Sequence, residues 1–523
     1  MPANENSIDT GETMRIVLAI LFLVLTATAF SAERPNIILI MADDLGYGDV
    51  GCYGASADTL PTPNIDRLAA EGLRFTRGYC SASTCTPTRY SLMTGQYAFR
   101  QQGTGIGGIN TAALVRPGRT TLPSLLKSAG YATAVVGKWH LGLGEKEQGP
   151  QWNGELKPGP LEIGFDYCFL LPNTNDRVPS VYVENHRVRN LDPADPLTVS
   201  NKNPDGQPTG KTHRHTLRMD WSHGHSSTIH NGISRIGFMS GGKAALWRDE
   251  DLADDFIRQS VAWIEAHQNE RFFLFFSSHD CHVPRMPHER FQGKSTLGYR
   301  GDAIVQLDWC VGELIKTLKR HDLDEKTLVI FCSDNGPVLD DGYQDGAEEK
   351  VGTHQPAGMY RGGKYSVYEG GTRIPFITWW PGQIRPGVSD EMVCTIDLAA
   401  SVAAMTGQSL PQDACPDSFD VWDALVGKRG ASGRRQLIQQ GNNMRRLGFI
   451  DRNWKLIRAG DTGKGNARRK KDQADSLALY NLEVDPGEQY NLVKVHPDKA
   501  KALSDQLNAL IQAGRSRVTA VLP

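Results

Sequence analysis

Four continuous apolar runs constrain the fold of this chain more than any other feature. They cover residues 37–41, 132–136, 272–276 and 328–332. Strands that are covered on both faces have unbroken apolar runs of this kind. Helical apolar spacing precedes the third run, over residues 252–264, and the fourth, over residues 304–318. The alternation predicts an α/β fold with a large, doubly wound, mixed or mostly parallel sheet flanked by helices.

Polar residues follow directly after each apolar run. In chain order they are Asp43 and Asp44, Lys138 and His140, His282, and Asp334 and Asn335. Ligand sites in open α/β sheets form outside the carboxyl ends of the strands. These side chains are therefore expected to meet at one edge of the sheet.

The predicted set contains enough oxygen ligands for a divalent cation. Three carboxylates and one amide oxygen suit Ca²⁺ or Mg²⁺ and are poor ligands for Zn²⁺. Each aspartate taken alone could also be a helix N-cap or a turn residue after a strand. His279 and His282 could form a zinc pair, but no Cys or His partners stand nearby at the spacing of a zinc site. The joint placement of the aspartates favours a hard cation.

A further motif, Cys-Thr-Pro-Thr-Arg-Tyr-Ser-Leu-Met-Thr-Gly, occupies residues 85–95. Its Cys-x-Pro-x-Arg part alone would equally fit a buried cysteine beside a turn proline. Together with residues 130–142, 361–364 and 369–375, the motif resembles the signatures of type I sulfatases, which belong to the alkaline phosphatase superfamily. The resemblance extends from Pro35 to the last predicted helix. Thr88 is a small departure, because the family more often has serine at this variable position.

The resemblance implies a specific chemistry. A formylglycine-generating or anaerobic maturation enzyme would oxidise Cys85 to formylglycine, whose hydrated form attacks the sulfur of a sulfate monoester. A covalent sulfo-enzyme intermediate would follow, and its breakdown would restore the aldehyde. The resemblance also implies one Ca²⁺ per chain as cofactor, with the ligands Asp43, Asp44, Cys85, Asp334 and Asn335.

Roles for the remaining motif residues follow from the same resemblance. Lys138 and Lys364 would hold the sulfate, His140 would serve the nucleophile, and His282 would be the general acid. Arg89 completes the recognition motif around Cys85 and is expected among the catalytic residues. A histidine can donate a proton to a leaving alkoxide near neutral pH.

Two polar insertions provide candidate substrate residues, because long loops on α/β scaffolds often carry binding side chains. They contain Asp176 and Arg177, and His223 and His225. These side-chain types hydrogen-bond to sugars, which favours a sulfated carbohydrate over a simple aryl sulfate. Two alternatives remain at this stage: a phosphonate or phosphate monoester hydrolase of the same superfamily, and a non-catalytic sulfoglycan-binding protein.

The N-terminal region, residues 1–32, resembles a secretory signal peptide with an upstream extension. Met14-Arg15 precedes an apolar core over residues 16–25 and then small residues. This core is too short for a comfortable membrane span, so no stable membrane insertion is expected. Export to the periplasm or the cell exterior follows. A net charge of −2 provides no overall attraction to polyanions, and nucleic acid is not expected as a partner.

Two parts are expected in the mature chain: a catalytic α/β domain over residues 33–430 and a C-terminal α+β subdomain over residues 431–523. The subdomain resembles the small antiparallel sheet with a closing helix that ends sulfatases. Its strands are expected near residues 437–439, 448–450 and 454–457, and its helix at 497–513. A basic run at 464–471 is expected at a hairpin tip. The chain has nine cysteines, which could pair in an oxidising compartment or remain packed thiols.

Overall fold

The computed structural model describes residues 34–203, 206–442, 446–458 and 477–517. The expected signal peptide and the basic run at 464–471 lie outside the described residues, and both stay predictions. Residues from Asn36 onward form one compact unit. The division of this unit near residue 430 also stays a prediction.

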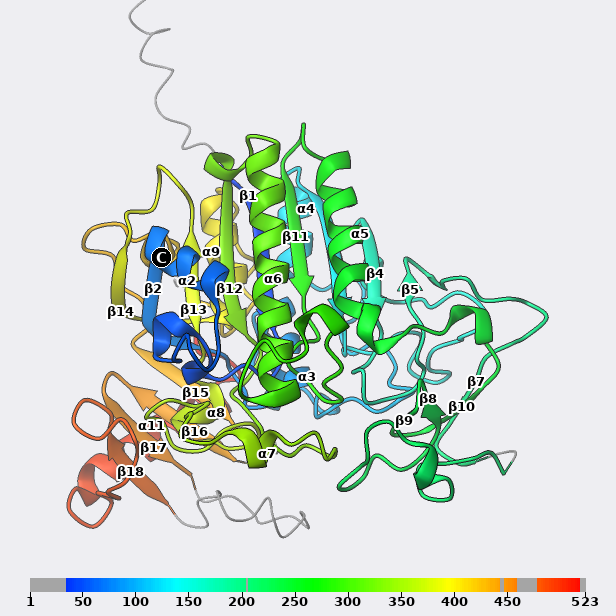
Figure 1. Cartoon of the computed structure of the whole chain (residues 1–523). Helices are drawn as coiled ribbons and strands as arrows, with labels where there is room; N and C mark the ends of the chain where they lie inside the picture. Colours follow the sequence, from blue (N-terminus) through cyan, green and yellow to red (C-terminus); the bar gives the residue numbers. More distant parts are fainter. Residues whose placement is uncertain (1–33, 204–205, 443–445, 459–476, 518–523) are drawn as a thin grey trace, which may run out of the picture. The chain divides into compact units, whose positions relative to one another are not determined.

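A ten-stranded mixed sheet forms the centre of the unit (Figure 1). Its five central strands, from β12 to β4, are parallel to one another, and β13 is antiparallel to both of its neighbours. The α/β prediction is thus confirmed. In spatial order the strands are β14 (Gly387–Cys394), β2 (Leu73–Tyr79), β13 (Phe376–Trp379), β12 (Thr327–Ser333), β1 (Asn36–Ala42), β11 (Phe272–Ser277), β3 (Ala132–Lys138), β4 (Tyr167–Leu171), β5 (Val183–Glu184) and β6 (Arg187–Val188).

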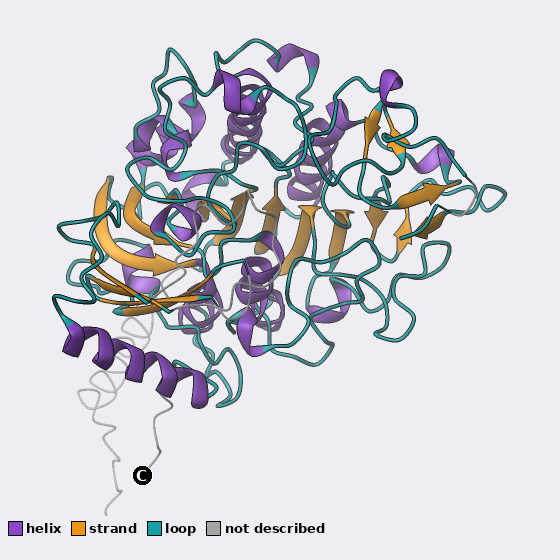
Figure 2. Ribbon diagram, turned by 90° about the horizontal axis from the view of Figure 1, so that it is seen from below, coloured by secondary structure: helices purple, strands orange, loops and turns teal. Residues whose placement is uncertain are grey.

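Helices cover both faces of the sheet, as the view along its edge shows (Figure 2). Side chains of β1 alternate between the two cores: Ile37 and Leu39 pack on one side, and Ile38 and Ile40 on the other. This explains why β1 is an unbroken apolar run. The Ile38 core includes α2 (Pro63–Glu71), α5 (Leu252–Ala266) and α6 (Gly298–Arg320), and the Ile37 core includes α3 (Cys85–Thr94), α4 (Leu122–Ser128) and α9 (Leu398–Met405).

A four-stranded antiparallel sheet and a final helix follow in the C-terminal part, as predicted. The sheet has the order β15 (Gln436–Gln440), β16 (Leu447–Asp451), β17 (Trp454–Ile457) and β18 (Ala478–Asn481). The helix is α11 (Pro497–Gln512), whose Leu503 and Leu507 are buried in the core of this sheet.

A buried ionic cluster joins the small sheet to the rest of the unit. Lys455 of β17 lies 2.9 Å from Glu369 and 2.9 Å from Glu488 through its Nζ atom. Glu369 opens the short helix α8 (Glu369–Thr372), so the cluster fixes the segment that follows Lys364 in the sequence. All three charged side chains are fully buried.

Smaller elements complete the described part of the chain. The second predicted insertion lies among two small antiparallel strand pairs, β7 (Thr198–Ser200) with β10 (Phe238–Ser240), and β8 (Ile229–His230) with β9 (Ile233–Ser234). Two further short helices are α7 (Ala347–Lys350) and α10 (Trp422–Leu425).

All nine cysteines are free thiols, so the alternative of packed thiols holds in this structure. Eight of them are buried, including Cys168 and Cys332. Among the described residues, no helix combines the length and the apolar character that a membrane crossing requires.

Candidate active site

Cys85 is the first residue of α3 and is only 2% exposed. Thr84 in extended conformation precedes the helix, and Pro87 lies in its first turn, where a missing backbone N–H costs no hydrogen bond. The helix ends at Gly95, which has a φ of 59°. Burial raises the pKa of the Cys85 thiol, although the charges of Lys138 and Lys364 oppose the rise.

Two adjacent strands bring the predicted oxygen ligands together. In the β1–β12 register Ala42 lies beside Ser333, so Asp43 and Asp334 leave the sheet at the same point. An oxygen of each of these two carboxylates and the Cys85 sulfur lie within 4.8 Å of one another. Asn335 donates a hydrogen bond to Asp44 at 2.7 Å, which places the remaining pair in the same cluster.

The cluster has the properties of a cation site. Asp43 Oδ1 and Asn335 Oδ1 are buried atoms without a hydrogen-bond partner in the described part of the chain. Burial raises the pKa of Asp43 well above its usual range, and the negative charge of Asp334 adds to this rise. A divalent cation would satisfy both oxygens and offset the repulsion between the carboxylates. The donor set is entirely oxygen apart from Cys85, and therefore fits the predicted hard metal.

Two buried lysines reach the same carboxylates. Lys138 is the last residue of β3 and forms an ion pair with Asp43. Lys364 lies 2.8 Å from Asp44 and 2.8 Å from Asp341. Both ammonium groups therefore stand at the predicted metal cluster, where they could also contact the oxygens of a tetrahedral anion.

Arg89 is fully buried and holds Asp334 in place. Its Nε and Nη2 atoms donate hydrogen bonds to Asp334 Oδ2 at 3.0 Å and 2.9 Å. Its Nη1 donates to the Lys138 carbonyl at 3.1 Å and to Ser277. These bonds to the walls of the site orient the Asp334 carboxylate.

The two ring nitrogens of His140 differ in their hydrogen bonding. Nε2 lies 3.1 Å from the Gly107 carbonyl, and a carbonyl can only accept, so Nε2 carries the proton. Nδ1 is buried and has no hydrogen-bond partner among the described residues. Burial and the positive charges of Lys138 and Arg177 hold the pKa of His140 well below its usual range. The neutral ring thus has a lone pair available at Nδ1 to accept a proton.

His282 follows β11 and has the opposite arrangement. Its Nδ1 lies 2.7 Å from the Val283 carbonyl, and its Nε2 lies 3.9 Å from Asp44 Oδ2. Nε2 is therefore the atom that faces the carboxylate cluster. Burial and the cations Lys364 and Lys138 hold the pKa of His282 well below its usual range. An anion bound between the two lysines would oppose this effect and favour the protonated ring.

The four predicted substrate residues fall into one connected group. His225 Nε2 lies 2.8 Å from Asp176 Oδ2, and Arg177 donates to Asp176 Oδ1 at 3.1 Å. The His223 carbonyl lies 2.8 Å from His225 Nδ1, whereas the His223 ring is directed to Ser222. The group lies beside His282, because Asn175 donates to the carbonyls of His282 and Pro284 at 3.4 Å and 3.1 Å.

The structure also adds site residues that the sequence motifs did not reveal. Asp341 is buried and binds Lys364, and both of its oxygens lie within 3.0 Å of the Tyr365 hydroxyl. Gly107 orients His140 through its carbonyl, and Ser277 contacts Arg89. An acidic pair at 340–341, between the Asp334 and Lys364 motifs, was the only sequence signal for Asp341.

Left-handed backbone conformations gather at the same place. Asp44 has a φ of 61°, His140 a φ of 53° and Tyr365 a φ of 75°. Non-glycine residues rarely adopt such angles unless the surrounding structure enforces them, and they occur often at functional sites. The site is therefore rigidly held at three separate segments.

Comparisons with known proteins agree with this geometry. The sulfatase family model matches residues 35–408. The N-acetylgalactosamine-6-O-sulfatase of Bacteroides thetaiotaomicron is 47% identical over 483 residues, which cover 92% of this chain and 94% of the relative. Human arylsulfatase A is 32% identical and covers 95% of this chain and 93% of its own length. A solved 6S-sulfatase of B. thetaiotaomicron, from work on the metabolism of multiple glycosaminoglycans, has a TM-score of 0.89 at 47% identity, over 92% of this chain and all of that one.

Proposed function

The chain belongs to the sulfatase family and is a sulfuric ester hydrolase, and on that premise we propose that it removes the 6-O-sulfate of N-acetylgalactosamine in glycosaminoglycans. The observation that carries the proposal is the convergence of Cys85, the carboxylates of Asp43 and Asp334, and two lysines in one buried site. The choice of sugar is supported by the B. thetaiotaomicron relative, which is an N-acetylgalactosamine-6-O-sulfatase.

The nucleophile and the metal are part of the same proposal. Formylglycine at position 85 would add water to form a geminal diol, one hydroxyl of which attacks sulfur while the other loses its proton to expel the sulfate and restore the aldehyde. Asp43, Asp44, Asp334, Asn335 and the modified residue 85 would hold Ca²⁺, which would supply positive charge to the site.

The chain's own residues perform the remaining work. Lys138 and Lys364 attract the sulfate and place its sulfur at residue 85. His140 accepts a proton at Nδ1, while the Gly107 carbonyl keeps the ring in the required orientation. His282, anchored at Nδ1, has its Nε2 free to give a proton to the departing sugar oxygen. Asp341 contacts Lys364 at 2.8 Å and helps to keep it in place.

Asp176, Arg177 and His225 are proposed to bind the sugar. Although burial opposes ionisation, the Arg177 guanidinium and the bond to His225 hold the pKa of Asp176 well below its usual range. A charged acceptor beside a guanidinium donor can bind a sugar hydroxyl from two sides. His223 is a third exposed and is proposed to contact the substrate at the rim.

Release of inorganic sulfate provides the test. We expect turnover of N-acetylgalactosamine 6-sulfate, much slower turnover of the 4-sulfate, and no comparable release of phosphate or phosphonate. A Cys85→Ala variant is the matched inactive control. Preferential turnover of a phosphonate monoester would contradict the assignment, and tight glycan binding without sulfate release would favour a binding protein.

Maturation and export complete the proposal. Peptide mass spectrometry of active protein should find formylglycine at position 85, and full activity with an unmodified cysteine would exclude this nucleophile. Export to the periplasm or cell exterior rests on the Met14–Ala32 sequence, and sequencing the mature N-terminus near Pro35 would test it.

A further inference from the structure

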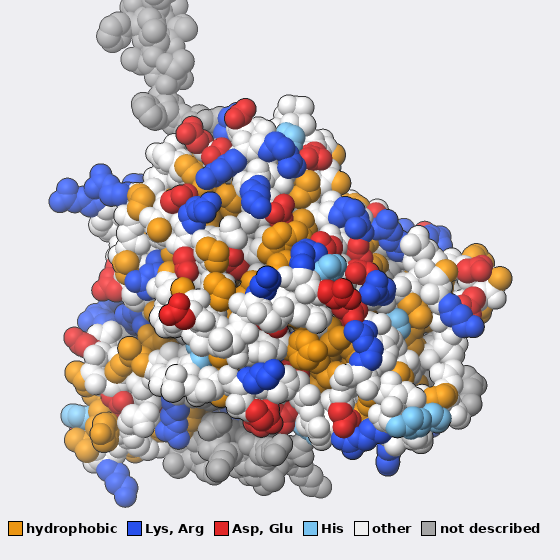
Figure 3. Space-filling view, in the orientation of Figure 1, with side chains coloured by type: hydrophobic (Ala, Val, Ile, Leu, Met, Phe, Trp, Pro, Cys, Tyr) orange, Lys and Arg blue, Asp and Glu red, His pale blue; other side chains and the backbone are white. Residues whose placement is uncertain are grey.

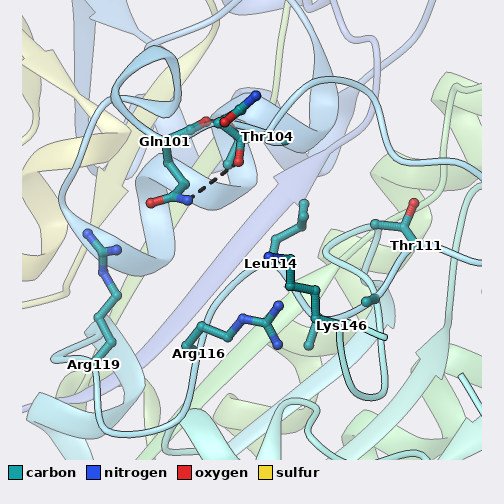
Figure 4. A pocket seen from close by; sticks show the side chains of 11 residues that line it. Gln101, Thr104, Thr111, Leu114, Arg116, Arg119 and Lys146 are labelled. Carbon is teal, nitrogen blue, oxygen red and sulfur yellow. Dashed lines mark hydrogen bonds between the residues drawn. The ribbon is translucent and has the colours of Figure 1, made fainter. Parts of the chain in front are cut away.

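A separate pocket lies beside the active site and is rich in positive charge (Figure 4). Its volume is about 600 Å³, within the range of small-molecule sites. Gln101 and Thr104 lie on one side, and Arg116, Arg119 and Lys146 lie across from them. None of the described residues that line it is acidic.

The cationic side chains of this pocket differ in how many contacts they make with other side chains of the protein. Arg119 donates a hydrogen bond to Tyr90 at 2.9 Å and another to Gln96, and its guanidinium lies over the Tyr90 ring. Arg116 and Lys146 are exposed, and in the described part of the chain no ion pair is recorded for either. Three cations without a lining carboxylate form a local positive field in a chain of net charge −2.

The two glutamates next to Lys146 in the sequence do not neutralise the positive charge inside the pocket. Glu145 and Glu147 are exposed, and neither lines the pocket. They lower the positive potential at its rim, where solvent and salt screen charge strongly.

The wall of the pocket is rigid and continuous with the catalytic residues. Leu143 donates a backbone hydrogen bond to Thr111 at 3.0 Å, and Leu114 donates one to Leu141 at 2.9 Å. Gly142, with a φ of 73°, permits this contact, since a Cβ atom there would stand 2.1 Å from the Ala112 carbonyl oxygen. The segment that carries His140 is thus tied along its length to the lining of the pocket.

Gly107 marks the boundary between the pocket and the active site. Its N–H donates to the Thr86 hydroxyl at 3.1 Å, and its carbonyl holds His140. A Cβ atom on Gly107 would stand 3.3 Å from His140 Cδ2 and 3.5 Å from Thr111 Oγ1, so a catalytic ring and a pocket-lining hydroxyl pack against the same glycine. Gly107 is itself buried, so this one residue separates the His140 ring from the Thr111 side of the pocket.

We infer that this pocket binds an anionic group, a carboxylate or a second sulfate, on a sugar next to the one that is desulfated. The inference rests on the proposed function, because it assumes a sulfated glycan chain at Cys85. It makes the enzyme selective for charged oligosaccharides over single sugars. Arg116 and Lys146 are the binding residues, and Arg119 supplies charge and shape to the wall.

Kinetics on matched substrates test the inference. The substrates are N-acetylgalactosamine 6-sulfate, an oligosaccharide in which this sugar is next to a uronate, and the same oligosaccharide after reduction of the uronate to a neutral sugar. Arg116→Ala and Lys146→Ala should each raise KM for the uronate oligosaccharide roughly tenfold, the equivalent of one charge-assisted contact. Their KM for the monosaccharide and for the reduced oligosaccharide, and their kcat on all three substrates, should stay within twofold of the wild type.

Arg385→Ala is the matched control, because Arg385 is an exposed arginine just before the amino end of β14 and so lies away from the carboxyl ends that form the site. It should change none of these values. A reduced oligosaccharide that keeps a second sulfate separates the two anions: recovery of tight binding would assign the pocket to sulfate, and its failure to recover would assign the pocket to carboxylate. Equal losses on monosaccharide and oligosaccharide, or no loss at all, would overturn the inference.

A binding measurement separates failure of the pocket from failure of the proposed function. Calorimetric titration of the uronate oligosaccharide into inactive Cys85→Ala protein avoids turnover, and adding Arg116→Ala should raise its Kd about tenfold at low salt. Unchanged Kd values together with normal sulfate release would refute the pocket alone. Absence of sulfate release from every substrate would refute the proposed function, while a higher Kd would still support the anion site.

Discussion

At the scale of single residues, His282 has a role that two substrates can distinguish. A sugar oxygen is a poor leaving group and needs a proton, whereas nitrophenolate leaves unaided. His282→Ala should therefore lower the rate of sulfate release from N-acetylgalactosamine 6-sulfate by about 10²–10⁴-fold, the usual contribution of a general acid. On nitrophenyl sulfate the loss should be much smaller, and steady-state kinetics would measure both.

Lys364→Met is a useful companion variant because Lys364 contacts the charged cluster and its proposed role is to hold the sulfate. Loss of a charge that is common to both substrates should lower both rates by similar factors. If His282→Ala also lowered both rates equally, His282 would act on the sulfate or the nucleophile and not on the leaving group.

One group of the predicted site residues stands in motifs at the ends of apolar runs. Asp43 and Asp334 belong to this group, and the structure brings them together because parallel strands place the residues that follow them at one edge. Asp341 and Gly107 were not predicted. Each lies in a loop, and the pattern of apolar residues does not determine the path of a loop. The tautomer of His140 depends on the Gly107 carbonyl, a contact that the sequence does not predict.

At the scale of elements, the junction between β17 and α8 depends on one lysine. Lys455 is the only cation that contacts both Glu369 and Glu488 in the described structure. Lys455→Met would leave two buried carboxylates without their shared partner and should lower the free energy of unfolding by about 3–5 kcal/mol. Chemical denaturation would measure the loss.

The exposed pair of Lys501 and Asp505 on α11 is the matched control for this element. Lys501→Met should not change the unfolding free energy measurably, because exposed pairs contribute little. A loss in Lys455→Met no greater than in the control would show that the cluster does not support the junction.

The same cluster should make stability depend on pH. Burial raises the pKa of Glu488 from its ordinary 4.5 to about 7, since one lysine cannot neutralise two carboxylates. The folded state then keeps a proton that the unfolded chain loses, so stability declines as pH rises from 4.5 to 7. Glu488→Gln lacks this titration. As pH rises from 4.5 to 7, the unfolding free energy of the variant minus that of the wild type should therefore increase by on the order of 2–3 kcal/mol. A difference between the two proteins that does not vary with pH would contradict this.

Central elements were easier to predict than peripheral ones. The strands β1, β11 and β12 are buried on both faces, and their composition alone identified them within two residues of their ends. The edge strand β14 is exposed over its first half, and β13 is only four residues long and antiparallel to both neighbours. Such strands form because a partner is already present, a condition that the local sequence does not encode.

At the scale of the whole described unit, bound Ca²⁺ should stabilise the fold as well as support activity. The predicted metal ligands follow β1 and β12 and include the first residue of α3, elements that are far apart in the sequence, so a bound ion would link them. The chelated protein should be inactive, and added Ca²⁺ should restore activity and stabilise the fold by about 1.4 kcal/mol per tenfold excess over Kd. Thermal unfolding and elemental analysis would record the effect and a stoichiometry of one.

Asp334→Asn is the control for this metal effect, because it removes one charge at the centre of the predicted ligand set. Its melting temperature should no longer respond to Ca²⁺. Two zinc ions per chain, or a melting temperature in the wild type that is indifferent to Ca²⁺, would contradict the metal assignment.

Surface charge gives the unit no general affinity for sulfated polymers. Positive and negative side chains are mixed over the face that Figure 3 shows. Attraction of a polyanion therefore has to come from a restricted group of cations, such as the one around Arg116 and Lys146.

The strand order also determines how late during protein synthesis the site can form. β1 lies between β11 and β12, and the last residue of β12 is Ser333. Roughly 250 residues therefore have to be translated after Cys85 before β1 can have both neighbours, which takes on the order of 10–50 s at ribosomal speed. Until then, the segments that bury Cys85 at the start of α3 are incomplete. On the proposed maturation, an enzyme that oxidises Cys85 in the unfolded chain has this interval in which to act.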